Sequence, residues 1–405
     1  MPPVHLIRFG DKIELSEAVA KAGCDMKSLP YFENRREMLQ LCVTDVPAPA
    51  ASIIKQEMLA RGGDAAVHAQ VITCGVSKSD VIIFGTAKQL GHLAEKLARM
   101  PWWGLERLAD DIRALIAPKG PCPMKLPCGA ELAFGEGMLL MGIINLTDDS
   151  FFAGSRSGAE TEETVKRALR MASEGADILD LGAESTRPGA GRVPEEQEIS
   201  RMESAVRAIR RELPLMPLSI DTTRSSVARA ALDAGADIIN DVSGLQFDEK
   251  IAQAAAEYGA ALVVMHMRGT PGDMQTKCEY GDLISEVCSF LREAAEKAER
   301  LGVPRKNIII DPGVGFAKDY NQNLLLMRHC ESFKALGYPL LVGASRKGVV
   351  GTATRTKRAE DRLCGTLALT SVCCWQGADI IRVHDVRENK EVIMMTEAVR
   401  RAKYV

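Results

Sequence analysis

The 405-residue sequence lacks the features that mark several specialised classes of protein. It has no block of basic residues, and its 51 Lys and Arg against 54 Asp and Glu give a formal net charge of −3. No nucleic-acid or membrane partner is therefore expected. No apolar run approaches the roughly 18 residues that cross a bilayer, and the first residues lack the basic and apolar regions of a secretory signal peptide. A cytoplasmic protein is predicted.

The eleven cysteines are scattered and form no Cys-x-x-Cys pair. In a chain of this length such cysteines are predicted to be reduced residues of the core rather than a metal or redox site. The first 117 residues also lack a glycine-rich phosphate-binding fingerprint. Any anion that the protein binds must therefore be held by groups placed locally around it.

The C-terminal two-thirds of the chain instead shows a regular alternation of short and long segments. Eight short apolar runs are separated by longer amphipathic stretches such as Thr161 to Glu174 and Leu283 to Leu301. The runs are too short for helices and almost unbroken in apolarity, which is typical of parallel strands covered on both faces. In order, they are LLMGIIN (139–145), ADILDLG (176–182), PLSID (217–221), ADIINDVSG (236–244), ALVVMH (261–266), NIIIDPG (307–313), PLLVGAS (339–345) and ADIIRVHD (378–385).

Eight strand-helix units predict an α/β fold, a (β/α)8 TIM barrel over residues 138–405, because such barrels take about 250 residues. A Gly-Ala-Asp sequence before the second, fourth and eighth runs indicates the same helix-to-strand turn each time. Neither helix nor strand tolerates the cluster of prolines and glycine that begins at Pro118, so residues 118–137 are interpreted as a linker leading into the barrel. Residues 1–117 mix helical and strand patterns and predict a smaller α/β domain of unknown role.

Polar side chains follow every one of the eight runs. Active sites of such barrels lie at the C-terminal ends of the strands, and burying a polar group on each strand is costly unless the groups converge on a ligand. Asp221 and Asp311 each end an apolar run without an adjacent basic residue, so their charges require donor-rich partners. The full set is Asn145, Asp180 with Glu184, Asp221, Asn240 with Asp241, His266, Asp311, Ser345-Arg346-Lys347, and Arg382-His384-Asp385.

Three members of this set have an equally simple structural explanation. Asp241 is as well suited to capping the following helix as to binding a ligand. His266 fits a core histidine whose hydrogen bonds are satisfied, and Asp385 fits a helix N-cap or a partner of another site residue. Asp180 and Glu184 are interpreted as supports for the groups that bind the ligand.

The remaining side chains divide into two chemical groups. Asn145, Arg382 and His384 come from the first and last strands, which become neighbours when a barrel closes, and their donors suit a phosphate or diphosphate. A second group, from the third, fourth, sixth and seventh strands, offers donors and acceptors for a flat heterocycle; it comprises Asp221, Asn240, Asp311 and Lys347. The segments 145–160 and 184–192 are predicted to be loops that close over the site and exclude water, with Arg187 reaching inward.

These residues stand in motifs that resemble dihydropteroate synthase, the family that joins 6-hydroxymethyl-7,8-dihydropterin diphosphate to p-aminobenzoate. The resemblance covers about residues 138–400, nearly the whole predicted barrel. The motifs, in the order of the family, are MGIINLTDDSF, GADILDLGAESTRPGA, LSIDTTR, GADIINDVSG, VVMHMRGTP, IIIDPGVGF, LLVGASRKG and DIIRVHDV.

The resemblance implies a role for each matching residue. Asp311 is the first choice to accept the 2-amino and N3 hydrogens of the pterin as a fork. In this family the diphosphate departs first, which gives a cationic pterin methylene, and the arylamine nitrogen then attacks this cation. The protein therefore acts mainly by electrostatics and orientation. We also expect a homodimer. The implied sites are Asp221, Asn240, Met265, Asp311, Gly343 and Lys347 for the pterin; Asn145, Arg382 and His384 for the diphosphate, with Mg²⁺ at Asn145; Thr186, Arg187, Pro188 and Gly348 for the arylamine; and Asp221, Asp311, Lys347 and Arg187 for catalysis.

The motifs depart from the family at two loops. Asp148 stands where the family has Pro, and Phe152-Ala153-Gly154-Ser155 stands where it has Ser-Asp-Gly-Gly. Gly348 replaces a Ser that helps to bind the p-aminobenzoate carboxylate. A synthase variant that uses another arylamine is therefore one alternative. A methyltetrahydrofolate:corrinoid methyltransferase-like pterin protein is another, although it needs no diphosphate site, and a non-enzymatic pterin-binding scaffold is a third.

Overall fold

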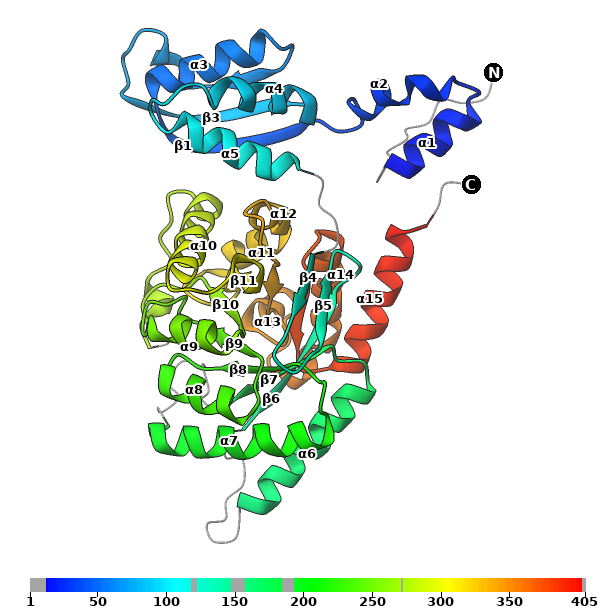
Figure 1. Cartoon of the computed structure of the whole chain (residues 1–405), viewed down its shortest axis with the longest axis vertical. Coiled ribbons are helices and arrows are strands. Elements are labelled where there is room, and N and C mark those ends of the chain that lie inside the picture. The colour runs from blue at the N-terminus through cyan, green and yellow to red at the C-terminus, as the bar shows by residue number, and fades with distance from the viewer. Residues whose placement is uncertain (1–11, 118–121, 147–156, 184–192, 271, 403–405) are drawn as a thin grey trace. The chain divides into compact units, whose positions relative to one another are not determined.

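The computed structural model describes residues 12–117, 122–146, 157–183, 193–270 and 272–402 (Figure 1). The chain forms two compact units, one of Met1–Pro118 with Arg400–Val405 and the other of Lys119–Val399. Within the described ranges, no helix combines the length and apolar content that a membrane crossing requires. A cytoplasmic location stays a prediction.

The N-terminal unit is built on a three-stranded antiparallel sheet in the order β1-β3-β2. Alternate residues of β3 are buried, among them Val81 and Ile83, so one face of the sheet packs on apolar helix residues. A smaller α/β region before the barrel is thereby confirmed. Its elements are α1 (Lys12–Lys21), α2 (Leu29–Glu33), β1 (Leu39–Pro47), α3 (Ala48–Leu59), β2 (Asp64–Ala66), β3 (Lys78–Gly85), α4 (Ala87–Leu97) and α5 (Leu105–Ile116).

The second unit is the predicted eight-stranded parallel barrel. Its strands pair in the order β11-β10-β9-β8-β7-β6-β13-β12, and a parallel bridge between Ile310 and Leu340 joins the two ends of the sheet. Each strand lies within one of the eight apolar runs, so the fold prediction is confirmed. The strands are β6 (Leu139–Asn145), β7 (Ile178–Gly182), β8 (Leu218–Asp221), β9 (Ile238–Asp241), β10 (Ala261–Met265), β11 (Ile308–Asp311), β12 (Leu341–Val342) and β13 (Ile380–Val383).

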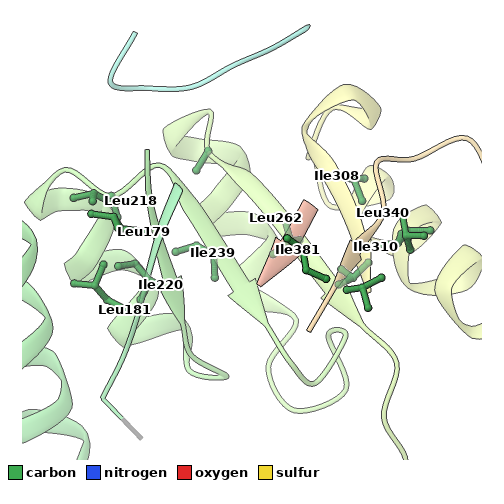
Figure 2. Close-up of a cluster of buried hydrophobic side chains, with 14 of the residues drawn as sticks. Leu179, Leu181, Leu218, Ile220, Ile239, Leu262, Ile308, Ile310, Leu340 and Ile381 are labelled. Atoms are coloured by element: carbon green, nitrogen blue, oxygen red, sulfur yellow. The ribbon is translucent and has the colours of Figure 1, made fainter. Parts of the chain in front are cut away.

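Side chains that alternate along each strand divide the apolar residues into two layers. One set packs with the surrounding helices, and Figure 2 labels ten of its members, from Leu179 to Ile381. The helices between and after the strands are α6 (Ser157–Ser173), α7 (Glu195–Glu212), α8 (Ser225–Ala234), α9 (Lys250–Tyr258), α10 (Leu283–Arg300), α11 (Tyr320–Arg328), α12 (Cys330–Lys334), α13 (Gly348–Thr354), α14 (Leu363–Trp375) and α15 (Val386–Arg400).

The other apolar set packs with a hairpin formed by β4 (Cys122–Lys125) and β5 (Glu131–Phe134). Met124 and Phe134 of the hairpin are buried with Met141, Ile178 and other residues of the barrel strands. The expectation that the proline-rich segment excludes strands was wrong at this hairpin. Both strands of a two-stranded ribbon are edges, where a proline such as Pro123 is tolerated.

The three Gly-Ala-Asp sequences make the same connection, as their recurrence indicated. In each, the glycine has a positive φ between 81° and 109°. The aspartate then forms two hydrogen bonds with one residue near the start of the neighbouring strand. The backbone N–H of the aspartate donates to the carbonyl of that residue, and the carboxylate accepts from the N–H of the same residue. The pairs are Asp177 with Leu140, Asp237 with Leu218, and Asp379 with Leu340, and the carboxylates also pair with Lys390, Arg210 and Lys334 respectively.

Replacing Asp237 with Ala should destabilise the barrel by about 3 kcal/mol, because it leaves a partly buried guanidinium without its opposite charge and two backbone N–H groups without their acceptor. The carboxylate accepts from Arg210, from Leu218 N and from Cys128 N. Urea unfolding followed by circular dichroism measures the change. The matched control is Glu257→Ala, which removes an exposed partner of Arg229 and should change stability little. Equal effects of the two substitutions would contradict this account of the turn.

Candidate functional site

The side chains inside the barrel change from apolar to charged toward the C-terminal ends of several strands. In β13, Ile380 lies in the apolar layer that contacts the hairpin. Arg382 is two residues further on and therefore faces the same side. Ile178 and Asp180 repeat this arrangement in β7. The interior of the barrel thus holds a charged layer above an apolar one.

A guanidinium between two carboxylates forms the centre of the charged layer. Arg382 Nε donates to Asp180 Oδ2 at 2.6 Å, and Arg382 Nη2 donates to Asp221 Oδ2 at 2.8 Å. Asp180 has no exposed surface, and it also accepts from Ser219 Oγ at 2.6 Å and from Asn240 Nδ2 at 3.4 Å. Side chains from four strands are joined in this way.

This network alters the acid-base behaviour of Asp221 and Arg382. Burial raises the pKa of Asp221 to about 7, and the opposing effect of Arg382 is partly cancelled by the nearby Asp180. Burial acts to lower the pKa of Arg382, but Asp180 and Asp221 outweigh it and raise that pKa above its ordinary value. Asp221 can therefore change its charge near neutral pH, while Arg382 stays charged.

Asp311 at the end of β11 and Lys347 directly before α13 form a second charged group. Asp311 Oδ1 accepts from Gly313 N at 2.7 Å. Burial raises the pKa of Asp311, and Lys347 acts in the opposite direction. Lys347 Nζ donates to Val314 O and lies 4.7 Å from the centre of the Phe316 ring, while burial lowers its pKa to about 8 against the effect of Asp311.

Gly343 leaves space between the two charged groups. A Cβ atom placed on it would lie 3.9 Å from Lys347 Nζ and 3.8 Å from Arg382 Cβ. A larger side chain would therefore fill the position that faces both cations. Met265 lies at the same end of the barrel, buried in an apolar cluster with Phe316. A planar apolar ring bordered by polar atoms would meet both kinds of surface here.

Three further predicted residues lie at the strand ends or in the segments that follow them. Asn145 is exposed, and the pairing register places it level with Gly182 and Asp221 on the adjoining strands. His384 Nδ1 lies 3.0 Å from Ser345 Oγ, which ties β13 to the segment after β12. Gly348 opens α13, and no atom lies within 4 Å of the place its Cβ would take. Glu184, Thr186, Arg187 and Pro188, together with the departures at Asp148 and residues 152–155, lie outside the described residues.

The three residues with structural alternatives have defined partners. The carboxylate of Asp241 accepts from Ser243 N and Leu245 N, so it holds the turn after β9, well before the start of α9. Asp385 binds the guanidinium of Arg346. Because Arg346 is paired with Asp385, which directly precedes α15, Lys347 is the residue of the Ser345-Arg346-Lys347 segment that lies beside Asp311.

His266 is buried, and its Nδ1 lies 2.9 Å from Lys318 Nζ. Burial, assisted by Lys318 and Arg268, lowers the pKa of His266 to about 2. It is therefore a neutral histidine with a satisfied ring nitrogen, as the core interpretation expects.

Sequence reasoning missed Ser219 and Lys318. Ser219 stands two residues before Asp221, so the alternation of the strand was sufficient to place it on the same face. Lys318 is only 2% exposed. It lies in a loop, seven positions after Asp311, where no periodic pattern indicates which way a side chain points.

Known proteins match the barrel in both sequence and fold. The family model described as "Pterin binding enzyme" matches residues 141–384. A dihydropteroate synthase of Synechocystis is 42% identical over 278 residues, which is 68% of this chain and 96% of that protein. The solved structure of Xanthomonas albilineans dihydropteroate synthase with 4-aminobenzoic acid has a TM-score of 0.63 and 37% identity, and the match covers 70% of this chain and all of that one.

One relative also matches residues outside the barrel. A probable bifunctional folylpolyglutamate synthase/dihydropteroate synthase of Haloferax volcanii is 37% identical over 376 residues, 90% of this chain and 44% of that protein. This match is longer than the unit Lys119–Val399. It therefore includes most of the N-terminal unit, which that relative shares.

The raised pKa of Asp221 predicts a pH dependence of stability. The folded protein keeps a proton on Asp221 up to a pKa of about 7, whereas the ordinary pKa of an aspartate is 3.8. The folded state therefore binds more protons than the unfolded state between these pH values. The contribution of Asp221 to the free energy of unfolding is therefore fully present below about pH 4, and it is lost as the pH rises toward and through 7. Relative to Asp221→Asn, which does not titrate, the wild type should lose stability between pH 5 and about 7.5.

Chemical denaturation of the two ligand-free proteins at a series of pH values measures this difference. A constant difference across the range would show that Asp221 is fully ionised in the folded protein. Asp248→Asn is the matched control, because burial acts to raise the pKa of that partly exposed carboxylate, but hydrogen bonds from Ser225 and Lys250 outweigh it and lower the pKa overall. Its difference from wild type should not change above pH 5.

Proposed function

We propose, since the chain belongs to the pterin binding enzyme family and within it to the dihydropteroate synthases, that its barrel condenses 6-hydroxymethyl-7,8-dihydropterin diphosphate with p-aminobenzoate. The products are 7,8-dihydropteroate and diphosphate, and the enzyme is a transferase. The observation that carries the proposal is the pairing of buried carboxylates with Lys347 and Arg382 around the open position at Gly343.

The pterin binds among Asp221, Asn240, Asp311 and Lys347, with Met265 and Gly343 bordering the ring. A carboxylate accepts two adjacent N–H groups as a fork, and the hydrogen bond from Gly313 N to Oδ1 holds the Asp311 carboxylate in place for this role. Lys347 supplies a donor beside it. Asp180 supports this group from below, because it holds Asn240 and Arg382 in place.

The diphosphate binds at the rim formed by Asn145, Arg382 and His384. Asn145 is exposed at the end of β6 and offers a carboxamide oxygen to Mg²⁺, which commonly takes its other ligands from substrate phosphates and water. Among the described residues, no group of three or more His, Cys, Asp or Glu side chains is arranged to hold a metal. The donor set therefore fits an ion that binds together with the diphosphate, where it would neutralise the charge of the leaving group.

The arrangement of charge favours departure of the diphosphate. Arg382 lies on the side of the leaving group, and the carboxylates Asp221 and Asp311 face the pterin, where positive charge develops on the methylene. Such fixed charges stabilise a transition state without reorganising solvent. The arylamine nitrogen then attacks the cation, with Thr186, Arg187, Pro188 and the Gly348 amide as its proposed binding groups.

We propose the domain limits in the same terms. Residues 138–405 form the pterin-binding barrel, and residues 118–137 lead into it through the hairpin that packs against its apolar layer. Residues 1–117 form a separate domain whose role is not assigned.

Turnover of the pterin diphosphate with p-aminobenzoate, measured as diphosphate release and pteroate formation, tests the function. Asp311→Ala should abolish detectable pterin binding in calorimetry, because the ring loses its forked acceptor, and turnover should fall at least about a thousandfold. The matched control is Asp319→Ala, an exposed cap of α11 in the same part of the chain. Product with another arylamine but not with p-aminobenzoate would correct the second substrate, and methyl transfer to a cobalamin would overturn the class.

We further propose that the protein is a homodimer. An apolar stripe is exposed along α14 and α15, formed by Val372, Trp375, Met395 and Val399, with exposed fractions from 43% to 64%. A hydrogen bond between Ser371 and Thr396 joins the two helices beside these residues. An apolar patch of this kind commonly marks a contact between proteins, and two-fold dimers are the most frequent assembly.

Trp375→Glu combined with Val372→Glu should convert the dimer to a monomer, because it places two charges inside the contact. Analytical ultracentrifugation at micromolar concentration measures the mass. Leu169→Glu, which changes an exposed apolar residue of α6, is the control and should leave the mass unchanged. A wild type that sediments as a monomer would refute the dimer.

A further inference from the structure

Lys318 is a buried lysine that neither the pterin nor the diphosphate assignment uses, and burial lowers its pKa to about 7. Its side chain is 2% exposed. The ammonium donates to Phe316 O at 2.8 Å and to Gly313 O at 3.1 Å, and it lies 2.9 Å from His266 Nδ1. These three acceptors match its three N–H groups. They come from the loop after β11 and from the end of the neighbouring β10.

The loop around this ammonium has an unusual backbone. Gly313, Gly315 and Ala317 all have positive φ values, of 70°, 88° and 50°. A Cβ atom on Gly313 would lie 2.0 Å from His266 O, so the loop passes directly against the end of β10. A left-handed alanine is unfavourable on its own. The converging carbonyls therefore need a fixed donor, and Lys318 supplies it.

The same loop holds the two main groups of the proposed pterin site. Gly313 N donates to Asp311 Oδ1 at 2.7 Å. Val314 O accepts from Lys347 Nζ, and the Phe316 ring lies under that ammonium. Gly313 and Phe316 also offer the carbonyls that Lys318 binds, and Val314 directly follows Gly313. Loss of the Lys318 ammonium would free the backbone that sets the positions of Asp311 and Lys347.

We propose that Lys318 is a positioning residue, whose ammonium folds the 312–317 loop into the shape that presents Asp311 and Lys347 to the pterin. The inference rests on the proposed function, since it concerns the same binding site. His266 acts with Lys318 as a neutral acceptor: its Nδ1 accepts a hydrogen bond from the ammonium, so its ring hydrogen is on Nε2. The positive charge of Lys318 also favours the ionised form of Asp311, whose pKa burial raises and both lysines lower.

Calorimetric binding of 6-hydroxymethyl-7,8-dihydropterin to the full chain tests the proposal. Lys318→Met keeps the length of the side chain and removes the ammonium, and it should weaken binding about tenfold to a hundredfold. Lys318→Gln restores an N–H₂ group that can donate to the loop carbonyls and should recover part of the loss. Lys306→Met, at the exposed N-terminal side of β11, is the matched control and should bind as the wild type does.

A double-mutant cycle separates positioning from a general loss of structure. If Lys318 acts through Asp311 and Lys347, the Lys318→Met change should weaken pterin binding clearly less in a Lys347→Met background than in the wild type, because the effects of coupled residues do not add. Full, independent effects of the two substitutions would overturn the proposal, as would Lys318→Met protein that binds the pterin within twofold of wild type. If Lys318→Met fails to fold, Lys318→Gln carries the same cycle. Absence of pterin binding by the wild type would instead refute the proposed function.

Discussion

The contact of Arg382 with Asp180 and Asp221 is the interaction on which the rest of the site depends. Two carboxylates inside a barrel are stable only if a cation and further donors accompany them. Arg382 spans from β13 to both of them and uses two different nitrogens to do so. Because Ser219 and Asn240 bind Asp180 as well, one guanidinium sets the geometry of four strand ends.

This contact changes the simple division into a ring end and a diphosphate end. From sequence, Arg382 belongs with Asn145 and His384, but in the structure it is already engaged by carboxylates from the pterin side. A diphosphate that approaches Arg382 must therefore share it with Asp221, and the two ends of the substrate are electrostatically linked through one side chain. Asp221, with a pKa of about 7, is the member of the network that can take up a proton when the guanidinium is drawn away.

The sequence was sufficient for the parts of the protein that follow from periodicity. The eight apolar runs predicted the strands, and the rule that barrel sites lie at strand ends selected Asp221, Asp311 and Lys347. Contacts that depend on the reach of a side chain were not predictable: nothing near Arg382 in sequence indicates Asp180. The hairpin with Pro123 and the loop around Lys318 were also missed, because both are defined by distant partners and not by a local pattern.

Aspartates have different roles at the two ends of the barrel. At the N-terminal end, Asp177, Asp237 and Asp379 each receive a backbone N–H and a basic side chain, so every charge is compensated within the folded chain. At the C-terminal end, burial exceeds compensation for Asp221 and Asp311, and their pKa values rise. Charges that are incompletely compensated lower stability but leave binding capacity for a ligand. The fully paired aspartates at the N-terminal end and the apolar layer therefore stabilise the fold, and this offsets the destabilising effect of the buried charges at the C-terminal end.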